Sequence, residues 1–472
     1  MNAEIINIGS EIMSGMVINT NAAFISKNLD ALGIKVNWVS AIGSDLHSIS
    51  KALNTASMRS SLVIVTGGLG PFLNDNTKKA CCNIFNLKLI MHKGSRKKIV
   101  EHYQKLEKDI SEAILQNAYI PKNASVIAND LGLVPGFYFA YGKTDFVFLP
   151  GTPAEMELMF EKYVMPLIVQ DNNLICGIRT VNIASISKFL VEKKIGSLLK
   201  GNNPKVVLFE THNECKIKVT ATSENSIVAN NLCDSTVAKI KQELGDNVYG
   251  VEYNNVSEKA VELLKINGKT VATAESCTAG LISALITSVP EVSRIFSFGV
   301  STYSNKMKIL ALNVKSETIE NYGAVSGHTA AEMAIGVKDM SGDSIGISIT
   351  GVAGPAKSEA KPVGLVYIGL ADGEKVWVFK RQIDKRKLQR NIIRDIASST
   401  AMDILRRYLE NSESIIPFGT QRDKEIHIVD FDSLILKSIE KYDKSVDFTT
   451  NQSVFSDDEL AEQMNKIIGN YE

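Results

Sequence analysis

Short apolar runs alternate with amphipathic stretches along the first third of the chain. Four of these runs end in glycine-containing turns, at residues 4–9, 35–43, 61–68 and 146–151. Between the first two runs, residues 20–33 show a helical spacing of apolar positions that stops at Gly33. Strand–turn–helix repeats predict a parallel or mixed sheet with helices on both faces. We therefore expect an α/β domain over residues 1–168, with any binding site at the carboxyl ends of its strands.

The alternation breaks off after this domain. The next section, residues 170–252, holds two helix-like stretches and a strand pair that turns at residues 212–214. The helix-like stretches are 185–200 and 226–245, and the strands are 206–211 and 215–223. This pattern predicts a small α+β module. Its polar side chains form no pattern that indicates chemistry, so we interpret it as a structural linker.

The alternation returns over residues 255–410 and predicts a second α/β domain. Helices are expected at 257–268, 277–289 and 387–410, and strands at 269–276, 296–304, 344–354, 364–372 and 375–383. The tail, residues 412–472, is more polar and less periodic. A helix is predicted within residues 458–472, and the rest of the tail is expected to be loosely ordered.

Composition narrows the function classes. A chain of 472 residues is expected to form two or three domains, and its 52 basic residues are balanced by 52 acidic ones. Because nonspecific nucleic-acid affinity rests on excess Lys and Arg, we expect no direct nucleic-acid binding. The chain contains no apolar stretch of roughly 18 residues, so no membrane span is expected. Scattered cysteines and the absence of a leader pattern indicate a reduced, cytoplasmic protein.

The segment AESCTAG, residues 274–280, falls where a predicted strand meets a predicted helix. It places Ser276 at the turn, with the amides of Cys277, Thr278 and Ala279 opening the helix. A nucleophile with an oxyanion hole, or a phosphate site, suits such a turn. An ordinary N-cap serine suits it too, and this segment alone favours the cap.

A nucleophilic serine needs a base. The only histidine of this region, His328, falls at a predicted helix start, whereas STYSNKMK, residues 301–308, ends a predicted strand and carries Lys308. A lysine serves as a base if burial lowers its pKa towards neutrality; taken alone, Lys308 is better interpreted as a solvated surface charge. The glycine-rich loop ITGVAGP, followed by KPVG (361–364), fits close approach to a ligand or a tight strand connection equally well.

Five segments decide between these alternatives: AESCTAG, GVSTYSNKMK, YGAVS, ITGVAGP and KPVGLVYI. Their order and spacing resemble the CinA C-terminal family, which includes stand-alone nicotinamide-nucleotide amidases. The resemblance implies an α/β amidase fold and hydrolysis of nicotinamide mononucleotide to nicotinate mononucleotide and ammonia. It also implies a homodimer, a small-molecule nucleotide as substrate, and no metal or organic cofactor for this step.

The resemblance assigns roles by motif. Ser276 would attack the carboxamide carbon, Lys308 would act as general base, and Tyr303 would join their hydrogen-bonding relay. Backbone amides of Thr278, Ala279 and Gly280 would hold the oxyanion, and further residues would line the substrate pocket: Asn305, Ser326, Thr350 and Gly351. The family commonly has Gly at the position of Ala279 and a glycine-rich continuation where this chain has AKSEA, residues 356–360.

The N-terminal domain carries NIGSEIMSG, NTNAAFIS, GGLGPFLNDNT, LVPG and LPGTPAEM in order. They are similar to the N-terminal half of full-length CinA proteins, which resembles the three-layer α/β molybdopterin-binding fold of MoaB and MogA. The turn with Gly67, Gly68 and Gly70 would cradle a phosphate or a pterin. The resemblance implies metal-dependent hydrolysis of ADP-ribose, with Asp75 as a candidate ligand of a divalent metal.

That second activity is expected to be weakened or lost. The usual motif has a Thr where this chain has Phe72, and paired aspartates where it has Asn74 and Asp75. Divalent metals prefer carboxylate oxygens, so losing one carboxylate and one hydroxyl weakens the site. A pterin- or nucleotide-binding protein, and a non-catalytic protein of DNA uptake or damage response, stay open as alternative functions.

Overall fold

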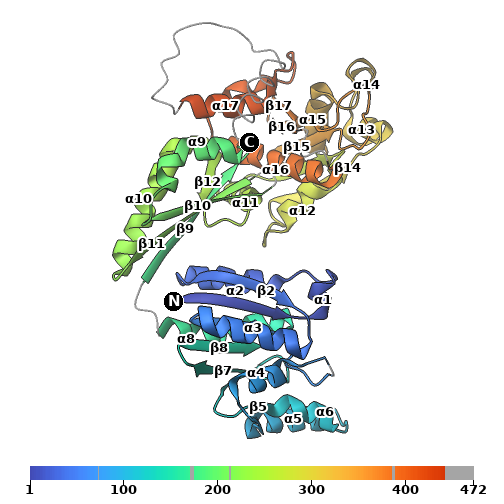
Figure 1. The fold of residues 1–472 in the computed structure, drawn as a ribbon. Helices are drawn as coiled ribbons and strands as arrows, with labels where there is room; N and C mark the ends of the chain where they lie inside the picture. Colours follow the sequence, from blue (N-terminus) through green and yellow to red (C-terminus); the bar gives the residue numbers. More distant parts are fainter. Residues whose placement is uncertain (73, 171–174, 212–213, 385–388, 442–472) are drawn as a thin grey trace. The chain divides into compact units, whose positions relative to one another are not determined.

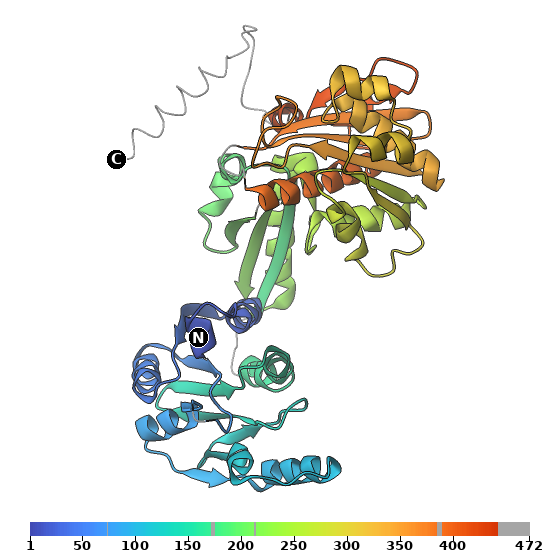
Figure 2. The same cartoon turned by 90° about the vertical axis from the view of Figure 1, so that its right-hand side faces the viewer.

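A computed structural model describes the chain except residues 73, 171–174, 212–213, 385–388 and 442–472 (Figures 1 and 2). The chain divides into two compact units. The first comprises Met1–Thr180, Ser197–Val207 and Lys218–Val237, and the second comprises Val181–Gly196, Leu208–Ile217 and Ala238–Glu472. None of the described helices combines the length and the apolarity that a bilayer span requires.

The N-terminal domain is built on a six-stranded sheet with the order β2-β1-β3-β8-β7-β6. Its strands are β1 (Asn2–Ile8), β2 (Lys35–Ile42), β3 (Leu62–Thr66), β6 (Ser125–Ile127), β7 (Gly136–Tyr141) and β8 (Thr144–Leu149), and β4 (Leu89–Met91) pairs with β5 (Tyr119–Pro121) in a small second sheet. The helices are α1 (Ser10–Met13), α2 (Thr20–Ala31), α3 (Leu46–Arg59), α4 (Thr77–Phe85), α5 (Lys93–Lys105), α6 (Glu112–Leu115), α7 (Pro153–Met159) and α8 (Met165–Gln170). Strands β2, β1, β3 and β8 each run parallel to the next strand in this order. Strand β7 is antiparallel to β8, and β6 is antiparallel to β7.

Alternate residues of β1 enter two separate cores, as a strand covered on both faces requires. Ala3 and Ile5 pack with α2 and α7 residues on one face, whereas Ile6 and Ile8 pack with α3 and α4 residues on the other. The predicted three-layer α/β domain is therefore confirmed.

The middle module has a four-stranded sheet with the order β10-β11-β9-β12. Its elements are β9 (Ile175–Ala184), α9 (Lys188–Leu199), β10 (Lys205–Glu210), β11 (Glu214–Ser223), α10 (Ser226–Leu244) and β12 (Val248–Val251). Both predicted helices and the predicted strand pair are present. The pattern did not reveal β9 or β12, and of the predicted turn, residues 212–213 lie outside the described residues while Glu214 already belongs to β11.

The C-terminal domain contains a seven-stranded sheet with the order β14-β13-β15-β16-β17-β18, and β19 also pairs with β17. Its strands are β13 (Val271–Glu275), β14 (Phe296–Ser301), β15 (Ile345–Gly351), β16 (Leu365–Asp372), β17 (Lys375–Gln382), β18 (Thr420–Gln421) and β19 (Ile428–Asp430). The helices are α11 (Val256–Ile266), α12 (Leu281–Thr287), α13 (Asn305–Leu312), α14 (Ser316–Tyr322), α15 (Gly327–Ser341), α16 (Arg390–Leu409) and α17 (Phe431–Lys441). Helix α15 packs on the central strands, and α16 packs on β15 and β16 together with α11 and α12.

Two expectations for this domain are wrong. The helix predicted from residue 277 begins at Leu281, and the segment read as a strand end at residues 305–308 is the first turn of α13. In the second case Ser304 is the N-cap, because its hydroxyl accepts a hydrogen bond from the amide of Met307 at 3.3 Å. A short helix entered directly from a strand has too few turns to show a clear period.

The expectation of a loosely ordered tail is wrong for residues 412–441, whereas the helix predicted within 458–472 lies outside the described residues. Both β18 and β19 pair with β17, and α17 packs over it. Phe431 is fully buried against Phe379, with ring centroids 6.0 Å apart. We call residues 412–441 the C-terminal extension. Its apolar positions are spread over a turn, two very short strands and one helix, so no single period reveals them.

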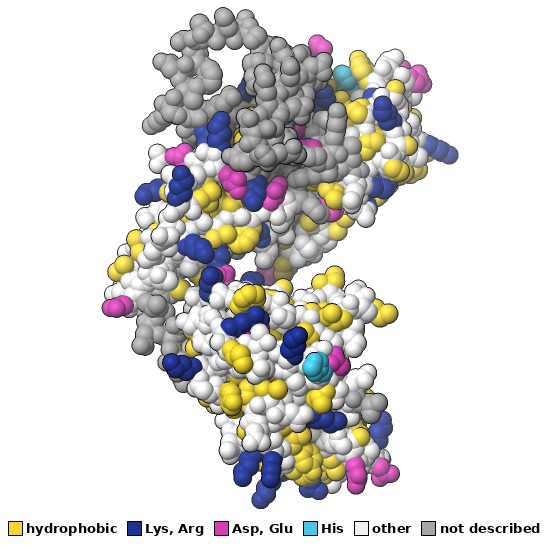
Figure 3. All heavy atoms as spheres, in the orientation of Figure 1, with side chains coloured by type: hydrophobic (Ala, Val, Ile, Leu, Met, Phe, Trp, Pro, Cys, Tyr) yellow, Lys and Arg dark blue, Asp and Glu magenta, His cyan; other side chains and the backbone are white. Residues whose placement is uncertain are grey.

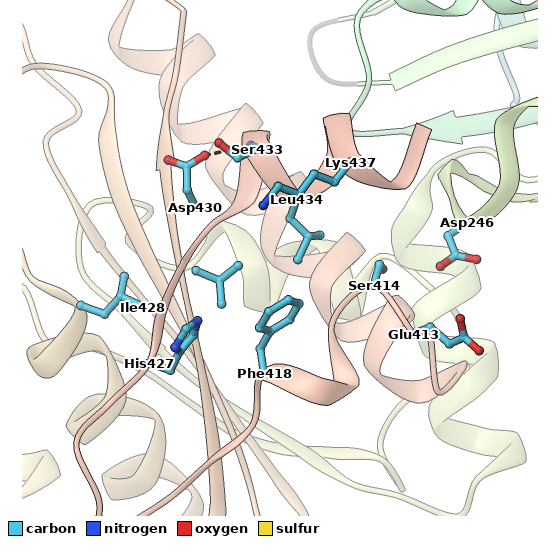
Figure 4. Close-up of a pocket in the computed structure, with 11 residues that line it drawn as sticks. Asp246, Glu413, Ser414, Phe418, His427, Ile428, Asp430, Ser433, Leu434 and Lys437 are labelled. Carbon is cyan, nitrogen blue, oxygen red and sulfur yellow. Dashed lines mark hydrogen bonds between the residues drawn. The ribbon is translucent and has the colours of Figure 1, made fainter. Parts of the chain in front are cut away.

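The extension also lines a cavity of about 560 Å³, shown in Figure 4. Phe418 and Leu434 point into it, and Asp246 and Lys437 lie at its sides. On the face drawn in Figure 3, Lys and Arg side chains are scattered among uncharged and acidic side chains, and some of them adjoin.

Replacing Leu434 with Ala should lower the free energy of unfolding by about 2–3 kcal/mol, because it leaves a cavity under α17. Leu434 is 7% exposed, whereas Leu436 of the same helix is 46% exposed and serves as the matched control. Leu436→Ala should change the free energy by less than about 0.5 kcal/mol. Urea unfolding of both variants measures the difference, and equal effects would show that the extension does not pack as described.

Candidate active site

Ser276 follows the last residue of β13, a central strand of the C-terminal sheet. Its amide donates to the carbonyl of Ile349 at 3.0 Å, which fixes the main chain of Ser276 to β15. The chain then turns through Ala279 and Gly280, whose φ angles are 49° and 95°, before α12 begins. Residues with left-handed φ angles cannot continue a right-handed helix. This explains why α12 starts four residues later than the pattern predicts.

The first amides of α12 do not face Ser276. Those of Gly280, Ile282 and Ser283 donate to the carboxylate of Glu275 at 2.9, 3.1 and 2.9 Å. The prediction that the helix opens at Cys277–Ala279 is therefore wrong, because α12 begins at Leu281 and the amides at its start bind Glu275. Of the amides proposed for the oxyanion, that of Gly280 is already engaged.

Lys308 lies in the first turns of α13 and is buried, with 1% of its surface exposed. Its Nζ lies 3.1 Å from Ser276 Oγ, 2.8 Å from the carbonyl of Thr302 and 3.3 Å from the carbonyl of Tyr303. The interpretation of Lys308 as a solvated surface charge is wrong. Burial lowers the pKa of its ammonium group, against the opposing effect of the Cys277 thiol and the Glu359 carboxylate.

These contacts suit the charged ammonium group, which donates to all three oxygens, and they also suit a neutral amine. An uncharged lysine has two N–H groups and one lone pair. With both N–H groups donated to the carbonyls of Thr302 and Tyr303, the lone pair is left to accept the proton of Ser276 Oγ. This is the arrangement that general-base activation of a serine requires.

Tyr303 contributes its main chain rather than its hydroxyl to this arrangement. Its side chain is 61% exposed, and its hydroxyl accepts a hydrogen bond from Arg390 Nη2 at 3.1 Å. Tyr303 therefore contacts Lys308 through its carbonyl, whereas its hydroxyl binds Arg390. Arg390, at the start of α16, also donates to the carbonyl of Gly354 at 2.6 Å.

Ser276 and Lys308 open into a cavity of about 210 Å³. Of the residues predicted for the oxyanion and the pocket, Asn305, Thr350 and Gly351 line this cavity, whereas Thr278, Ala279, Gly280 and Ser326 do not. Thr278 is fully buried, and Ser326 is the N-cap of α15, since its hydroxyl accepts from the amide of Thr329 at 3.1 Å.

Two charged cavity residues were missed in the sequence. Arg390 lies far from the other motifs along the chain, and Glu359 falls in the segment that departs from the family pattern. The Glu359 carboxylate accepts from the amides of Ala324 and Val325 at 3.0 and 3.2 Å and from Lys361 Nζ at 3.1 Å. Burial raises the pKa of Glu359, but these hydrogen bonds outweigh it and lower the pKa below its usual value.

Replacing Ala279 with Gly should stabilise the domain by about 0.5–1 kcal/mol. A side chain at a left-handed φ costs roughly 1–2 kcal/mol, and part of this gain is offset by the greater entropy of an unfolded glycine. Ala284 in α12 is an exposed helical alanine and provides the control. Ala284→Gly should destabilise by about 1 kcal/mol. Thermal unfolding measures the change in stability of both variants. Changes of the same sign would contradict the backbone strain at Ala279.

The predicted N-terminal site is a turn between β3 and α4. Gly67 and Gly68 have φ angles of 95° and 66°, and a Cβ on either would lie 2.2 Å from Ile8 O or Thr77 Oγ1. A cavity of about 520 Å³ is lined by Gly70, Phe72, Asp75, Lys78, Lys79, Glu112 and other residues. Burial lowers the pKa of Lys78 to about 8, although Asp75 opposes this.

The residues of this cavity do not fit a divalent metal. Asp75 accepts a hydrogen bond from the amide of Phe72 at 2.9 Å, and two lysines share its cavity. In the part of the chain that the structure describes, no three His, Cys, Asp or Glu side chains gather as a metal site would require. Lysines beside a glycine-rich turn favour an anionic group instead.

Fold and site together define an α/β protein whose C-terminal domain buries a Ser–Lys pair and whose N-terminal domain carries a glycine-rich turn between a strand and a helix. Residues 4–170 match the model of the probable molybdopterin binding domain, 179–250 that of the damage-inducible protein CinA KH domain, and 253–409 that of the CinA C-terminal domain. The chain belongs to the CinA family.

Relatives in several bacteria share most of this chain. A CinA-like protein of Kosmotoga olearia is 39% identical over 87% of this chain and 99% of its own length. A putative competence-damage inducible protein of Clostridium botulinum is 39% identical over 87% of this chain and 100% of its own. A solved CinA structure from Thermoplasma acidophilum, 32% identical, covers 36% of this chain and 97% of its own with a TM-score of 0.33. The C-terminal family model ends at residue 409, before the C-terminal extension.

Proposed function

We propose that the C-terminal domain hydrolyses the carboxamide of nicotinamide mononucleotide to nicotinate mononucleotide and ammonia. The observation that carries the proposal is the 3.1 Å approach of Lys308 Nζ to Ser276 Oγ in a cavity, with carbonyls as the other partners of Nζ. The substrate is anionic, and Arg390 at the cavity wall provides a cation for its phosphate.

The reaction would proceed in two halves. Lys308 takes the proton of Ser276 while Oγ bonds to the carboxamide carbon, and the oxygen of the carboxamide becomes negative. The carbon–nitrogen bond then breaks, Lys308 returns the proton to the leaving nitrogen, and ammonia departs from an acyl-enzyme. Water attacks that ester in the same way, with Lys308 taking its proton, and releases the carboxylate and Ser276.

Ammonia release from nicotinamide mononucleotide tests the proposal. The wild type should release ammonia, and Ser276→Ala should lower kcat by about 10³-fold or more, as loss of a nucleophile does. Ser288, an exposed serine that follows α12, supplies the control Ser288→Ala, which should keep wild-type activity. A wild type that releases no ammonia, or a Ser276→Ala variant as fast as wild type, would overturn the proposal.

We infer a second, binding function for the N-terminal domain, because Lys78 and Lys79 share a cavity with Gly70, the last glycine of the glycine-rich turn. A phosphorylated pterin or nucleotide supplies the anion that such a cavity favours. Titration calorimetry with ADP-ribose and with molybdopterin, with and without a divalent cation, tests this inference. Absence of binding by both ligands would overturn it.

A further inference from the structure

Glu275 is a carboxylate that the proposed reaction does not use. It is the last residue of β13, lies directly before Ser276 and has no exposed surface. On its two sides β13 pairs with β14 and β15, where Glu275 lies opposite Ser301 and Ile349. A charge in this position is costly unless hydrogen bonds compensate its loss of water.

Four neutral donors surround the carboxylate of Glu275. Oε2 accepts from the amides of Gly280 and Ile282 at 2.9 and 3.1 Å. Oε1 accepts from the amide and the hydroxyl of Ser283, both at 2.9 Å. Every one of these groups lies within eight residues of Glu275. The carboxylate therefore joins the end of β13 to the start of α12.

Ser276, the proposed nucleophile, lies between the two ends that Glu275 joins. Its amide is held by the carbonyl of Ile349, and the carbonyl of Thr278 accepts from Arg394 Nη2 at 2.8 Å. The turn nevertheless passes through left-handed φ angles at Ala279 and Gly280, which the chain does not adopt without compensation. The bonds to Glu275 supply that compensation at the far end of the turn.

We propose that Glu275 is a positioning residue that acts through Ser276. Its carboxylate holds the turn so that Ser276 Oγ stays within reach of Lys308 Nζ. It also withdraws the amides of Gly280, Ile282 and Ser283 from the site, which leaves the amide of Cys277, a cavity-lining residue, to bind the oxyanion. This inference rests on the proposed function, because it assigns the geometry on which that reaction depends.

The test compares Glu275→Gln, Glu275→Asp and Ser283→Ala in the full chain. Glu275→Gln should lower kcat for nicotinamide mononucleotide by about 10²-fold, since small misplacement of a nucleophile has effects of this size. KM should stay within about twofold, because the cavity wall does not change. Glu275→Asp keeps the charge and should recover part of kcat. Ser283→Ala removes a single donor and should lower kcat by about threefold to tenfold.

A second readout does not depend on the substrate. Covalent labelling of Ser276 by a fluorophosphonate should slow in Glu275→Gln in parallel with kcat. Glu320, an exposed residue of α14, supplies the control Glu320→Gln, which should leave labelling and kcat unchanged. If Glu275→Gln does not fold, Ser283→Ala decides by the same two readouts.

The outcomes separate the two proposals. Variants that lose thermal stability but keep kcat and labelling within twofold of wild type would overturn the positioning role and leave the amidase proposal standing. A wild type that is labelled at Ser276 but releases no ammonia would overturn the amidase proposal, and the labelling rates would still test Glu275. Failure of both labelling and ammonia release in the wild type would overturn both.

Discussion

Replacing Lys308 with Met should lower kcat for nicotinamide mononucleotide by about 10²- to 10⁴-fold, the range that general acid–base catalysis contributes. Methionine fills a similar volume without a basic nitrogen, and Lys308 is buried, so the domain is expected to stay folded. The ammonia assay measures the loss. Lys306 is an exposed residue of the same helix, and Lys306→Met, the matched control, should keep wild-type kcat.

The pH dependence gives the same residue a second test. Burial lowers the pKa of Lys308, so its neutral form is reached at a lower pH than in water. A base works in the neutral form; kcat should therefore rise with pH through the pKa of Lys308 and be lost as pH falls below it. This rise should be absent from the residual activity of Lys308→Met. A variant that keeps more than a tenth of wild-type kcat, or an unchanged pH profile, would contradict the role of Lys308.

The sequence predicts the framework of this fold because its sheets are covered on both faces. Strands such as β3 are buried along their whole length and therefore read as nearly continuous apolar runs between turns, whereas β13 is equally buried but contains Thr273 and Glu275. The pairing of Ser276 with Lys308 followed from the family resemblance. Without the family resemblance, Lys308 was interpreted as a surface charge. Its burial depends on elements that are distant in sequence, and the residues next to it do not indicate that burial.

Other parts of the site depend on tertiary contacts that have no local signal. Arg390 meets Tyr303 across 87 positions of the sequence. The donors to Glu275 could not be predicted, because the helix was expected to begin at residue 277 and it begins at Leu281. The C-terminal extension was missed for the same reason, since its strands are specified by the edge of β17 rather than by their own pattern.

The prediction with the largest expected effect on stability concerns α16. Asp403, Arg406 and Arg407 have no exposed surface, and Asp403 Oδ2 accepts from Arg407 Nε at 3.0 Å while Oδ1 accepts from Arg406 Nε at 3.1 Å. The guanidinium groups reach further, to the carbonyl of Asp246 and to Asn247 Oδ1, both at 2.9 Å. Asp403 thus binds two buried cations that hold α16 to the end of the middle module.

Replacing Asp403 with Asn should lower the free energy of unfolding by about 3–5 kcal/mol, because removing one partner of a buried ion pair strands the other charges. Glu410→Gln is the control, since Glu410 also accepts from Arg406, at 2.8 Å, but is partly exposed. Its effect should stay below about 1 kcal/mol. Urea unfolding at neutral pH measures both, and a loss no larger for Asp403→Asn than for Glu410→Gln would contradict the role of the buried cluster.

The dependence of stability on acid pH tests the effect of the Asp403 charge apart from the effect of the side chain's shape. Burial alone would raise the pKa of Asp403, but attraction by Arg406 and Arg407 outweighs it and lowers the pKa to about 2. A carboxyl group in an unfolded chain has a pKa of about 3.9. The stabilisation by Asp403 is therefore present in full above about pH 4 and is lost as pH falls towards 2. Wild type should lose stability over this range more steeply than Asp403→Asn, and parallel curves would show that the carboxylate charge does not hold α16 in place.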